Sequence, residues 1–184
     1  AALRIGSGLV TWAVPEALLP HVIGAAPELM LAAAATGRDG EWNADSAEEL
    51  LQLAQARDVL AVGPGLGRFT GDTGWLRRLW EEYEGPLVVD ADALNILASA
   101  GPELEAWKPR SAAVVLTPHP GEMARLLGIS TAEVQRDRIT HAQQYARTRG
   151  VTLVLKGART VIACPDGTAY VNTTGHAGMA TGGA

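Results

Sequence analysis

The chain has 184 residues, of which 47% are hydrophobic, and its formal net charge is −5 at pH 7. This length and apolar content predict one folded domain over residues 1–184 and exclude a disordered chain, while the acidic balance argues against a nucleic-acid partner. The single cysteine, Cys164, excludes an internal disulfide and a multi-cysteine metal site and favours a reducing cytosol. The sequence contains no run of 18 apolar residues, so we expect no membrane partner, and the cysteine count leads us to expect a cytoplasmic protein.

Both ends of the sequence are predicted to be interior points of a longer domain. Residues 1–8 resemble the last turns of a helix that ends at glycine, and no start signal precedes them. Residues 176–184 are rich in glycine and alanine, and backbone amides in such a run can converge on an anion at the start of a helix. The sequence stops before that helix, so we expect the domain to be incomplete.

Strand and helix patterns alternate along the chain. Short apolar runs predict strands, and amphipathic stretches predict helices. The predicted strands are residues 9–14, 29–33, 59–62, 87–89, 113–116, 151–155, 161–163 and 169–171. Several of these runs do not alternate with polar residues, which is typical of a sheet covered on both faces. The pattern predicts a layered α/β fold with a mostly parallel central sheet and helices on both faces.

Helix starts are marked by capping signals. Ser46 with Glu49, and Ser130 with Glu133, have the spacing of capping boxes. The second box is predicted to begin one helix that continues to about residue 149. Asp72 is predicted to be the N-cap of a helix between the strands at 59–62 and 87–89.

Four predicted strands end in glycine or polar groups. The segments that follow them are Gly63–Gly67, Asp90–Asn95, Thr117–Glu122 and Lys156–Thr160. Ligands of open α/β sheets bind beyond the carboxyl ends of the strands. Because no core requirement explains these residues, the sequence predicts a binding site at this edge.

The first of these segments, Gly63–Gly67, is not a dinucleotide fingerprint. The third glycine of that pattern would fall at Arg68, and Pro64 removes an amide from the turn. A tight strand-to-helix turn and a close backbone approach to a ligand both remain open as explanations of this loop.

His119 lies between Pro118 and Pro120, which predict an extended, inflexible segment. The histidine is either structural or a ligand contact, and a metal role is poor because no second ligand lies at suitable spacing.

Three charged residues at the strand ends each leave two roles open. Lys156 either extends its ammonium away from the sheet or binds a phosphate, and the nearby Gly157 and Thr160 favour the phosphate. Asp90 and Asp92 either hold a metal or cap the next helix, and capping is the commoner role.

Five segments together resemble the ADP-dependent NAD(P)H-hydrate dehydratase family, which has the ribokinase-like superfold. They are VGPGLGR at 62–68, VVDADALNIL at 88–97, VVLTPHPGEMARLLG at 114–128, LKGART at 155–160 and NTTGHAGMATGGA at 172–184. The resemblance covers essentially the whole chain in order. The TPHPGE and GMATGG sequences are its most specific parts.

The resemblance implies repair of hydrated NADH or NADPH, with ADP (or ATP) as the phosphate donor and Mg²⁺ expected alongside it. It assigns substrate contacts to Gly67 and His119. The implied nucleotide-binding residues are Lys156, Gly157, Ala158, Arg159 and Thr160, and the implied anion hole is formed by Gly178, Thr181, Gly182, Gly183 and Ala184. The family's catalytic aspartate would follow directly after Ala184, so no catalytic residue lies within the chain and the chain alone is expected to be inactive. A homo-oligomer and a fused epimerase domain are left open.

Two alternatives remain from the same motifs. Another ribokinase-like kinase, acting on a thiazole or pyrimidine alcohol, would use the same anion hole, because phosphoryl transfer needs mainly positioning and charge stabilisation. A nucleotide-binding module without turnover is the other alternative.

Overall fold

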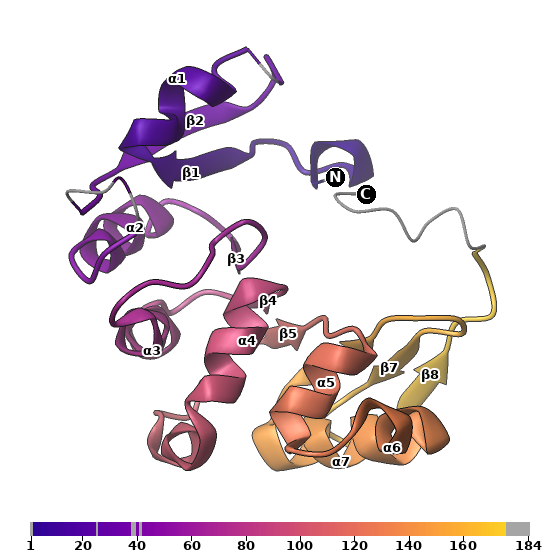
Figure 1. Cartoon of the computed structure of the whole chain (residues 1–184). Helices are drawn as coiled ribbons and strands as arrows, with labels where there is room; N and C mark the ends of the chain where they lie inside the picture. Colours follow the sequence, from indigo (N-terminus) through magenta and orange to yellow (C-terminus); the bar gives the residue numbers. More distant parts are fainter. Residues whose placement is uncertain (1, 25, 38–39, 41, 176–184) are drawn as a thin grey trace.

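The computed structural model describes residues 2–24, 26–37, 40 and 42–175, and Figure 1 shows their arrangement. The strands are β1 (Thr11–Pro15), β2 (Met30–Ala34), β3 (Leu60–Val62), β4 (Leu87–Val89), β5 (Val114–Leu116), β6 (Thr152–Leu155), β7 (Val161–Ala163) and β8 (Ala169–Val171). The α-helices are α1 (Leu19–Val22), α2 (Ser46–Ala54), α3 (Asp72–Glu82), α4 (Asp92–Ser99), α5 (Pro120–Leu127), α6 (Thr131–Arg136) and α7 (Arg138–Arg149). Short 3-10 helices span Ala2–Ile5, Glu16–Leu18 and Gly101–Ala106.

The main sheet has the strand order β3-β4-β5-β6-β7-β8. Strands β3 to β6 are parallel, with Leu87 paired to both Leu60 and Val114. Strand β7 runs antiparallel to both of its neighbours, β6 and β8. Strands β1 and β2 form a separate parallel pair. The expected α/β class with a mostly parallel sheet is therefore confirmed.

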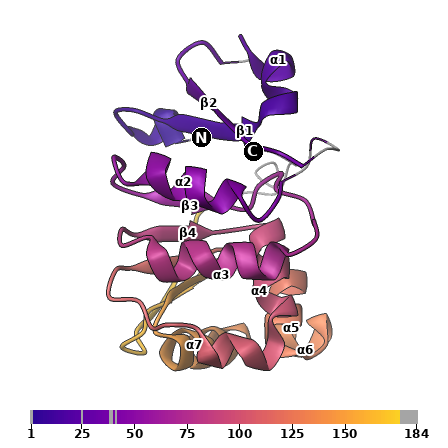
Figure 2. The same cartoon turned by 90° about the vertical axis from the view of Figure 1, so that its left-hand side faces the viewer.

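Helices α3 to α7 lie on one face of the main sheet (Figures 1 and 2). Successive parallel strands that are also spatial neighbours require this, because each right-handed connection returns over the same face. Burial agrees: Leu87 and Val89 of β4 are fully buried, whereas Val88 between them is partly exposed. The apolar runs predicted helices on both faces, and the described residues supply the layer on one face.

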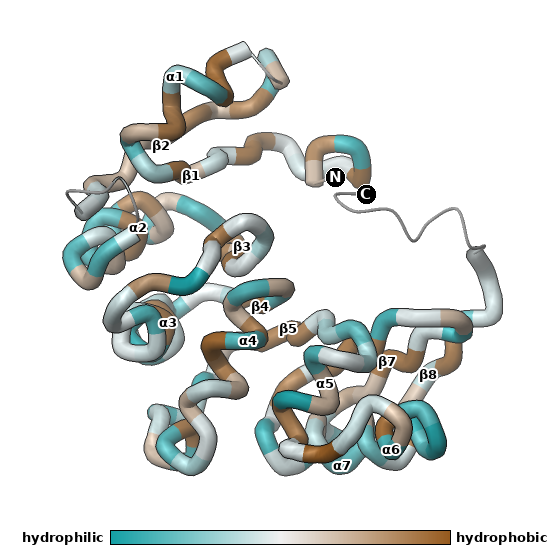
Figure 3. The backbone as a smooth tube through the Cα atoms, in the orientation of Figure 1, coloured by the Kyte–Doolittle hydropathy of each residue, from teal (hydrophilic) through white to brown (hydrophobic). Residues whose placement is uncertain are grey.

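The core lies between this helical layer and the sheet. Its largest fully buried side chains are Leu76, Leu79, Leu87, Leu94, Ile96, Leu97, Leu116, Met123, Leu153, Leu155, Val89 and Val134. Hydropathy follows the same division, with hydrophobic colour along β5 and β7 and hydrophilic colour on the outer turns of α6 and α7 (Figure 3). Burying each such side chain contributes about 1.5–3 kcal/mol to the stability of the fold.

Two predicted helix caps are wrong, although both helices begin close to the predicted positions. Ser46 is buried and caps nothing: its hydroxyl donates to the Asn43 carbonyl at 2.7 Å and accepts the Trp75 indole N–H at 2.9 Å. Glu49, its predicted box partner, accepts the Ala35 amide. Asp72 is the first residue of α3 and not its cap, which is Gly71 at φ +82°.

The capping box of Ser130 and Glu133 is confirmed, but the helix behind it is shorter than predicted. Both hydrogen bonds of the box are present at the start of α6. The helical conformation is then interrupted at Asp137 (φ −145°, ψ 70°), whose side chain accepts the Thr140 amide and caps α7. The single predicted helix is therefore two, and Arg138 is the first residue of the second.

Candidate functional site

The four predicted loops lie side by side at the carboxyl edge of the main sheet. They follow β3, β4, β5 and β6, which are consecutive neighbours in the parallel part of the sheet. Parallel strands end at the same edge, so residues far apart in sequence come into contact, as Asp90 and Lys156 do across 66 residues. The fold therefore confirms that the loops gather where ligands of α/β proteins bind.

The glycine loop after β3 packs directly against the turn after β4. Gly63 has φ +128°, and a Cβ there would stand 1.7 Å from the Asp90 carbonyl oxygen, so no other residue fits. The Gly67 amide donates to Asp92 Oδ2 at 2.8 Å. The close approach at Gly63 is thus to a neighbouring backbone. Gly67, in contrast, has no heavy atom within 4 Å of the position of a Cβ.

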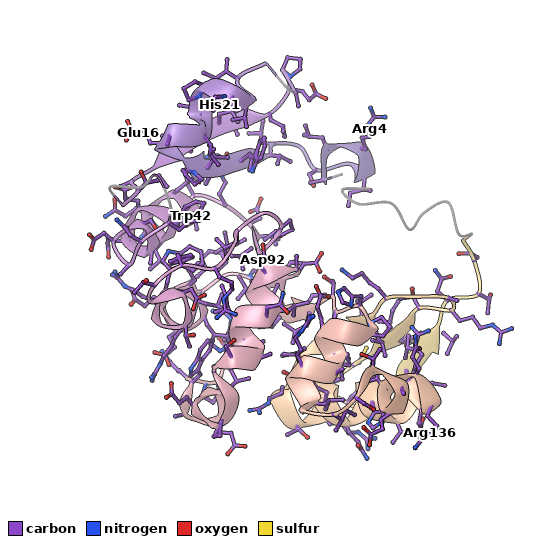
Figure 4. The ribbon with its side chains drawn as sticks, viewed as in Figure 1. Arg4, Glu16, His21, Trp42, Asp92 and Arg136 are labelled. Carbon is purple, nitrogen blue, oxygen red and sulfur yellow. The ribbon has the colours of Figure 1, made fainter. Side chains whose placement is uncertain are left out.

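The turn after β4 contains a strained residue. Ala91 has φ +49° and ψ −121°, a conformation that a residue with a Cβ adopts at a cost of order 1–3 kcal/mol. The Ala93 amide donates to the Asp90 carbonyl across this turn. Asp92 is the first residue of α4 (Figure 4). Neither aspartate side chain caps the helix. The capping interpretation of Asp90 and Asp92 is therefore wrong.

An ion pair joins the loops after β4 and β6. Lys156 Nζ donates to Asp90 Oδ1 at 2.7 Å, and the Lys156 amide donates to the Pro118 carbonyl at 2.8 Å. Partial burial raises the pKa of Asp90, but the hydrogen bonds from Lys156 and from the Ala91 amide outweigh it and leave this pKa below its ordinary value. Lys156 thus lies in the site, with Asp90 as its partner.

His119 is the N-cap of α5. Its Nδ1 accepts the amides of Gly121 and Glu122 at 3.0 and 3.3 Å, and Glu122 Oε2 accepts the His119 amide at 2.8 Å. This is a capping box with histidine in the place of serine. The backbone is extended as predicted, and the side chain remains half-exposed at the edge of the site.

The loop after β6 turns sharply. Gly157 has φ +138° and Arg159 has φ +57°, and the Thr160 hydroxyl donates to the Gly157 carbonyl at 3.1 Å. Among the described residues, the amides of Gly157, Ala158 and Arg159 have no acceptor. Consecutive free amides in a turn with positive φ form a concavity suited to an anion.

A surface hollow lies next to Gly67. Its volume is about 530 Å³, and it is lined by Arg68, Asn95, Ala98, Ser99 and Arg125. Arg68 donates to Asp72 and Ser99, and Arg125 donates to Asn95. The hollow therefore adds polar, partly cationic surface beside a predicted substrate contact.

Part of the predicted site lies outside the described residues. The anion hole of Gly178, Thr181, Gly182, Gly183 and Ala184 belongs to residues 176–184. Within the described chain, no group of three or more His, Cys, Asp and Glu side chains is placed to hold a metal ion. Asp90 and Asp92 each have a partner already, so these residues alone do not form a site for Mg²⁺.

Sequence reasoning missed two contacts that shape the site. Asp92 accepts the Gly67 amide, and Arg138 donates to the carbonyl of Leu155 at the end of β6 and to two carbonyls of the loop that follows. Asp92 stood out as a charged residue after a strand, but nothing in the sequence indicated its partner. No signal marked Arg138.

Comparison with known proteins decides the family. The model of a family described as NAD(P)H-hydrate dehydratase matches residues 1–184. The chain belongs to the NAD(P)H-hydrate dehydratase family. The resemblance inferred from the five segments is thereby confirmed, whereas the roles of individual residues stay predictions.

Relatives of this dehydratase-family chain are repair enzymes. A bifunctional NAD(P)H-hydrate repair enzyme of Moorella thermoacetica is 45% identical over 183 residues, which cover 100% of this chain and 34% of that protein. An ADP-dependent (S)-NAD(P)H-hydrate dehydratase of Neisseria meningitidis is 40% identical over 187 residues, covering 100% of this chain and 57% of that protein.

Solved structures of the dehydratase family share the fold. An ADP/ATP-dependent NAD(P)H-hydrate dehydratase of Bacillus subtilis, co-crystallised with ATP and Mg²⁺ and soaked with CoA, superposes with a TM-score of 0.77 at 29% identity, covering 99% of this chain and 61% of that one. A ribokinase-like superfamily protein of Enterococcus faecalis superposes with a TM-score of 0.74 at 24% identity, covering 99% of this chain and 58% of that one, which supports the ribokinase-like fold alone. The chain therefore spans less than two thirds of the length of these proteins.

In the described part of the chain, no helix has the length and apolar content needed to cross a membrane.

Proposed function

We propose that this domain restores NADH or NADPH from its hydrate with ADP, or ATP, as the phosphate donor. Family membership supports this reaction class, and the Neisseria meningitidis relative is named as an ADP-dependent dehydratase. The observation that carries the proposal is the row of strand-end loops, because it brings the family's substrate and nucleotide segments to one edge of the sheet.

The proposed chemistry converts a poor leaving group into a better one. The hydroxyl oxygen of the hydrate attacks the terminal phosphorus of ADP and loses its proton to a base, and the bond to AMP breaks. The carbon–oxygen bond of the phosphorylated ring then breaks, the neighbouring ring carbon loses a proton, and the products are NAD(P)H, AMP and inorganic phosphate. The family resemblance implies that this base is an aspartate directly after the position of Ala184.

The described residues supply binding and orientation in this proposal. Gly67, with open space at its Cα, and His119 contact the hydrated nicotinamide half, and the 530 Å³ hollow beside Gly67 gives room for an extended substrate. The amides of Gly157 to Arg159, which have no acceptor among the described residues, and the ammonium of Lys156 bind the phosphates of the nucleotide. Positioning of this kind supplies most of the catalysis in phosphoryl transfer.

Magnesium is expected to arrive with the nucleotide. Mg²⁺ is commonly bound by substrate phosphates together with one or two carboxylates. Because Asp90 and Asp92 already have partners within the protein, the proposal assigns neither carboxylate to the ion. Partners beyond the substrates follow the relatives: a fused epimerase domain fits the bifunctional Moorella protein, and a cytosolic location fits the single cysteine.

The test is incubation of the full-length protein with hydrated NADH and ADP while the dihydronicotinamide absorbance is followed. The proposal predicts that the absorbance returns. No return with either ADP or ATP contradicts it. A stable phosphoester that accumulates in place of inorganic phosphate would favour a small-molecule kinase.

A further inference from the structure

Arg138, the first residue of α7, reaches across to the loop after β6. Its guanidinium donates to the carbonyls of Ala158, Leu155 and Lys156 at 2.6, 2.9 and 3.1 Å. It also covers one side of Gly157, where a Cβ would stand 3.1 Å from Nη2. One planar side chain therefore fixes three peptide groups of a four-residue stretch.

Helix α7 gains nothing from a cation at this position. The start of a helix is the positive end of its dipole, so Arg138 is placed where its charge is repelled. Burial also lowers the pKa of its guanidinium, and its Nε is buried without a hydrogen-bond partner among the described residues. The hydrogen bonds to the carbonyls of residues 155–158 are therefore what explains an arginine at this position.

These contacts decide where the loop amides point. In a trans peptide, the carbonyl of one residue and the amide of the next point in opposite directions. With the carbonyls of Lys156 and Ala158 turned toward Arg138, the amides of Gly157 and Arg159 are turned away from it. These are two of the amides that have no acceptor within the described chain.

From this geometry we propose that Arg138 is a positioning residue for nucleotide binding: it orients the peptide groups of residues 155–158 so that the amides of Gly157 and Arg159 face the phosphates of ADP. The inference rests on the proposed function, because the family resemblance assigns this loop to the nucleotide. Arg138 itself stays on the far side of the loop and touches no ligand. Lysine cannot replace it fully, since an ammonium is a point charge and not a planar fork.

The experiment compares ADP binding to the full-length protein by calorimetry for wild type, Arg138→Met, Arg138→Lys and a control, Arg136→Met. Arg136 lies two residues earlier on the outer side of α6 and is exposed (Figure 4). We expect Arg138→Met to weaken ADP binding about 10- to 100-fold, the scale of lost charge-assisted hydrogen bonds. Arg138→Lys should recover part of this loss, and the control should bind as wild type does.

Two further readouts separate positioning from a general structural role. The KM for the nucleotide should rise in Arg138→Met while the KM for hydrated NADH stays unchanged. Millimolar guanidinium ion should restore ADP binding to Arg138→Ala, because it fills the position among the three carbonyls. If Arg138→Met does not fold, Arg138→Lys and the guanidinium rescue decide the question.

Equal ADP affinity in wild type and in a folded Arg138→Met overturns the inference. So does a loss of affinity that is the same for both substrates in Arg138→Met and that guanidinium does not rescue in Arg138→Ala. A wild-type protein that does not bind ADP contradicts the proposed function itself. The two failures are therefore distinguishable.

Discussion

At the scale of single residues, His119 combines two tasks in one ring. Because Nδ1 accepts two backbone amides, that nitrogen is unprotonated and the ring proton of the neutral form lies on Nε2. Nε2 lies 3.4 Å from Glu122 Oε1, on a half-exposed ring. A substrate can therefore receive a hydrogen bond from Nε2, while Nδ1 stays with the helix.

We predict that His119→Ala and His119→Asn differ in stability but not in activity. Asparagine can cap α5, whereas alanine cannot, so alanine should lower the free energy of unfolding by about 1 kcal/mol more. Both variants lose Nε2 and should turn over hydrated NADH more slowly, with ADP binding nearly intact. Full activity in His119→Asn would show that the histidine acts only as a cap. Lost ADP binding at unchanged stability would show that the two ligands are placed the wrong way round.

A second prediction concerns Lys156. Lys156→Ala should weaken ADP binding by about 1.5–3 kcal/mol, the usual scale of a charge-assisted hydrogen bond. Asp90→Asn is the matched control, since it removes the ion pair and keeps the ammonium. Calorimetry should show a loss in the first variant and none in the second. Unchanged ADP affinity in Lys156→Ala would restrict the lysine to its ion pair with Asp90.

The lowered pKa of Asp90 predicts a pH dependence. A carboxyl whose folded pKa lies below its unfolded value stabilises the fold above the unfolded pKa, near 3.8, and loses that contribution as the pH falls through the folded pKa. Wild type should therefore be more stable than Asp90→Asn at pH 7, and the difference should shrink below about pH 4. Urea unfolding at several pH values measures it. A difference that grows toward acid pH would contradict the ion-pair assignment.

At the scale of elements, the contact between the loops after β3 and β4 depends on the absent side chain of Gly63. A Cβ 1.7 Å from the Asp90 oxygen cannot be accommodated without moving a strand end. We predict that Gly63→Ala lowers the free energy of unfolding by about 3–5 kcal/mol, more than ordinary overpacking. Gly65→Ala is the control, because it shares a positive φ but has open space, and should cost about 1 kcal/mol. Similar losses in both variants would contradict the close approach.

Local sequence patterns predicted elements better than element boundaries. Apolar runs located β3 to β8, and the box of Ser130 and Glu133 was correct because both partners lie within one turn. Ser46 had the same local pattern but is buried under Trp75, a partner 29 residues away. The break at Asp137 was missed because its side chain caps a new helix where the pattern allowed the old one to continue.

For the candidate site, too, the location could be predicted from the sequence but the contacts could not. Glycine and polar residues at four strand ends predicted where the site lies, since the edge follows from strand direction alone. The contacts between loops could not be predicted, because Asp92 and Gly67, or Arg138 and Lys156, are brought together by packing and not by any spacing along the chain.

At the scale of the whole molecule, the topology explains why four loops that are separate in the sequence lie at one edge of the sheet. Consecutive parallel strands place each following loop beside the previous one, and the helices on one face leave the carboxyl edge accessible. The central claim is that the hydrate hydroxyl leaves as phosphate. Hydrated NADH labelled with ¹⁸O in that hydroxyl tests it directly, with the full-length protein, ADP and mass spectrometry of the released inorganic phosphate. The account predicts one ¹⁸O atom in each phosphate for every NADH restored. Unlabelled phosphate, with the ¹⁸O recovered in water, would contradict it.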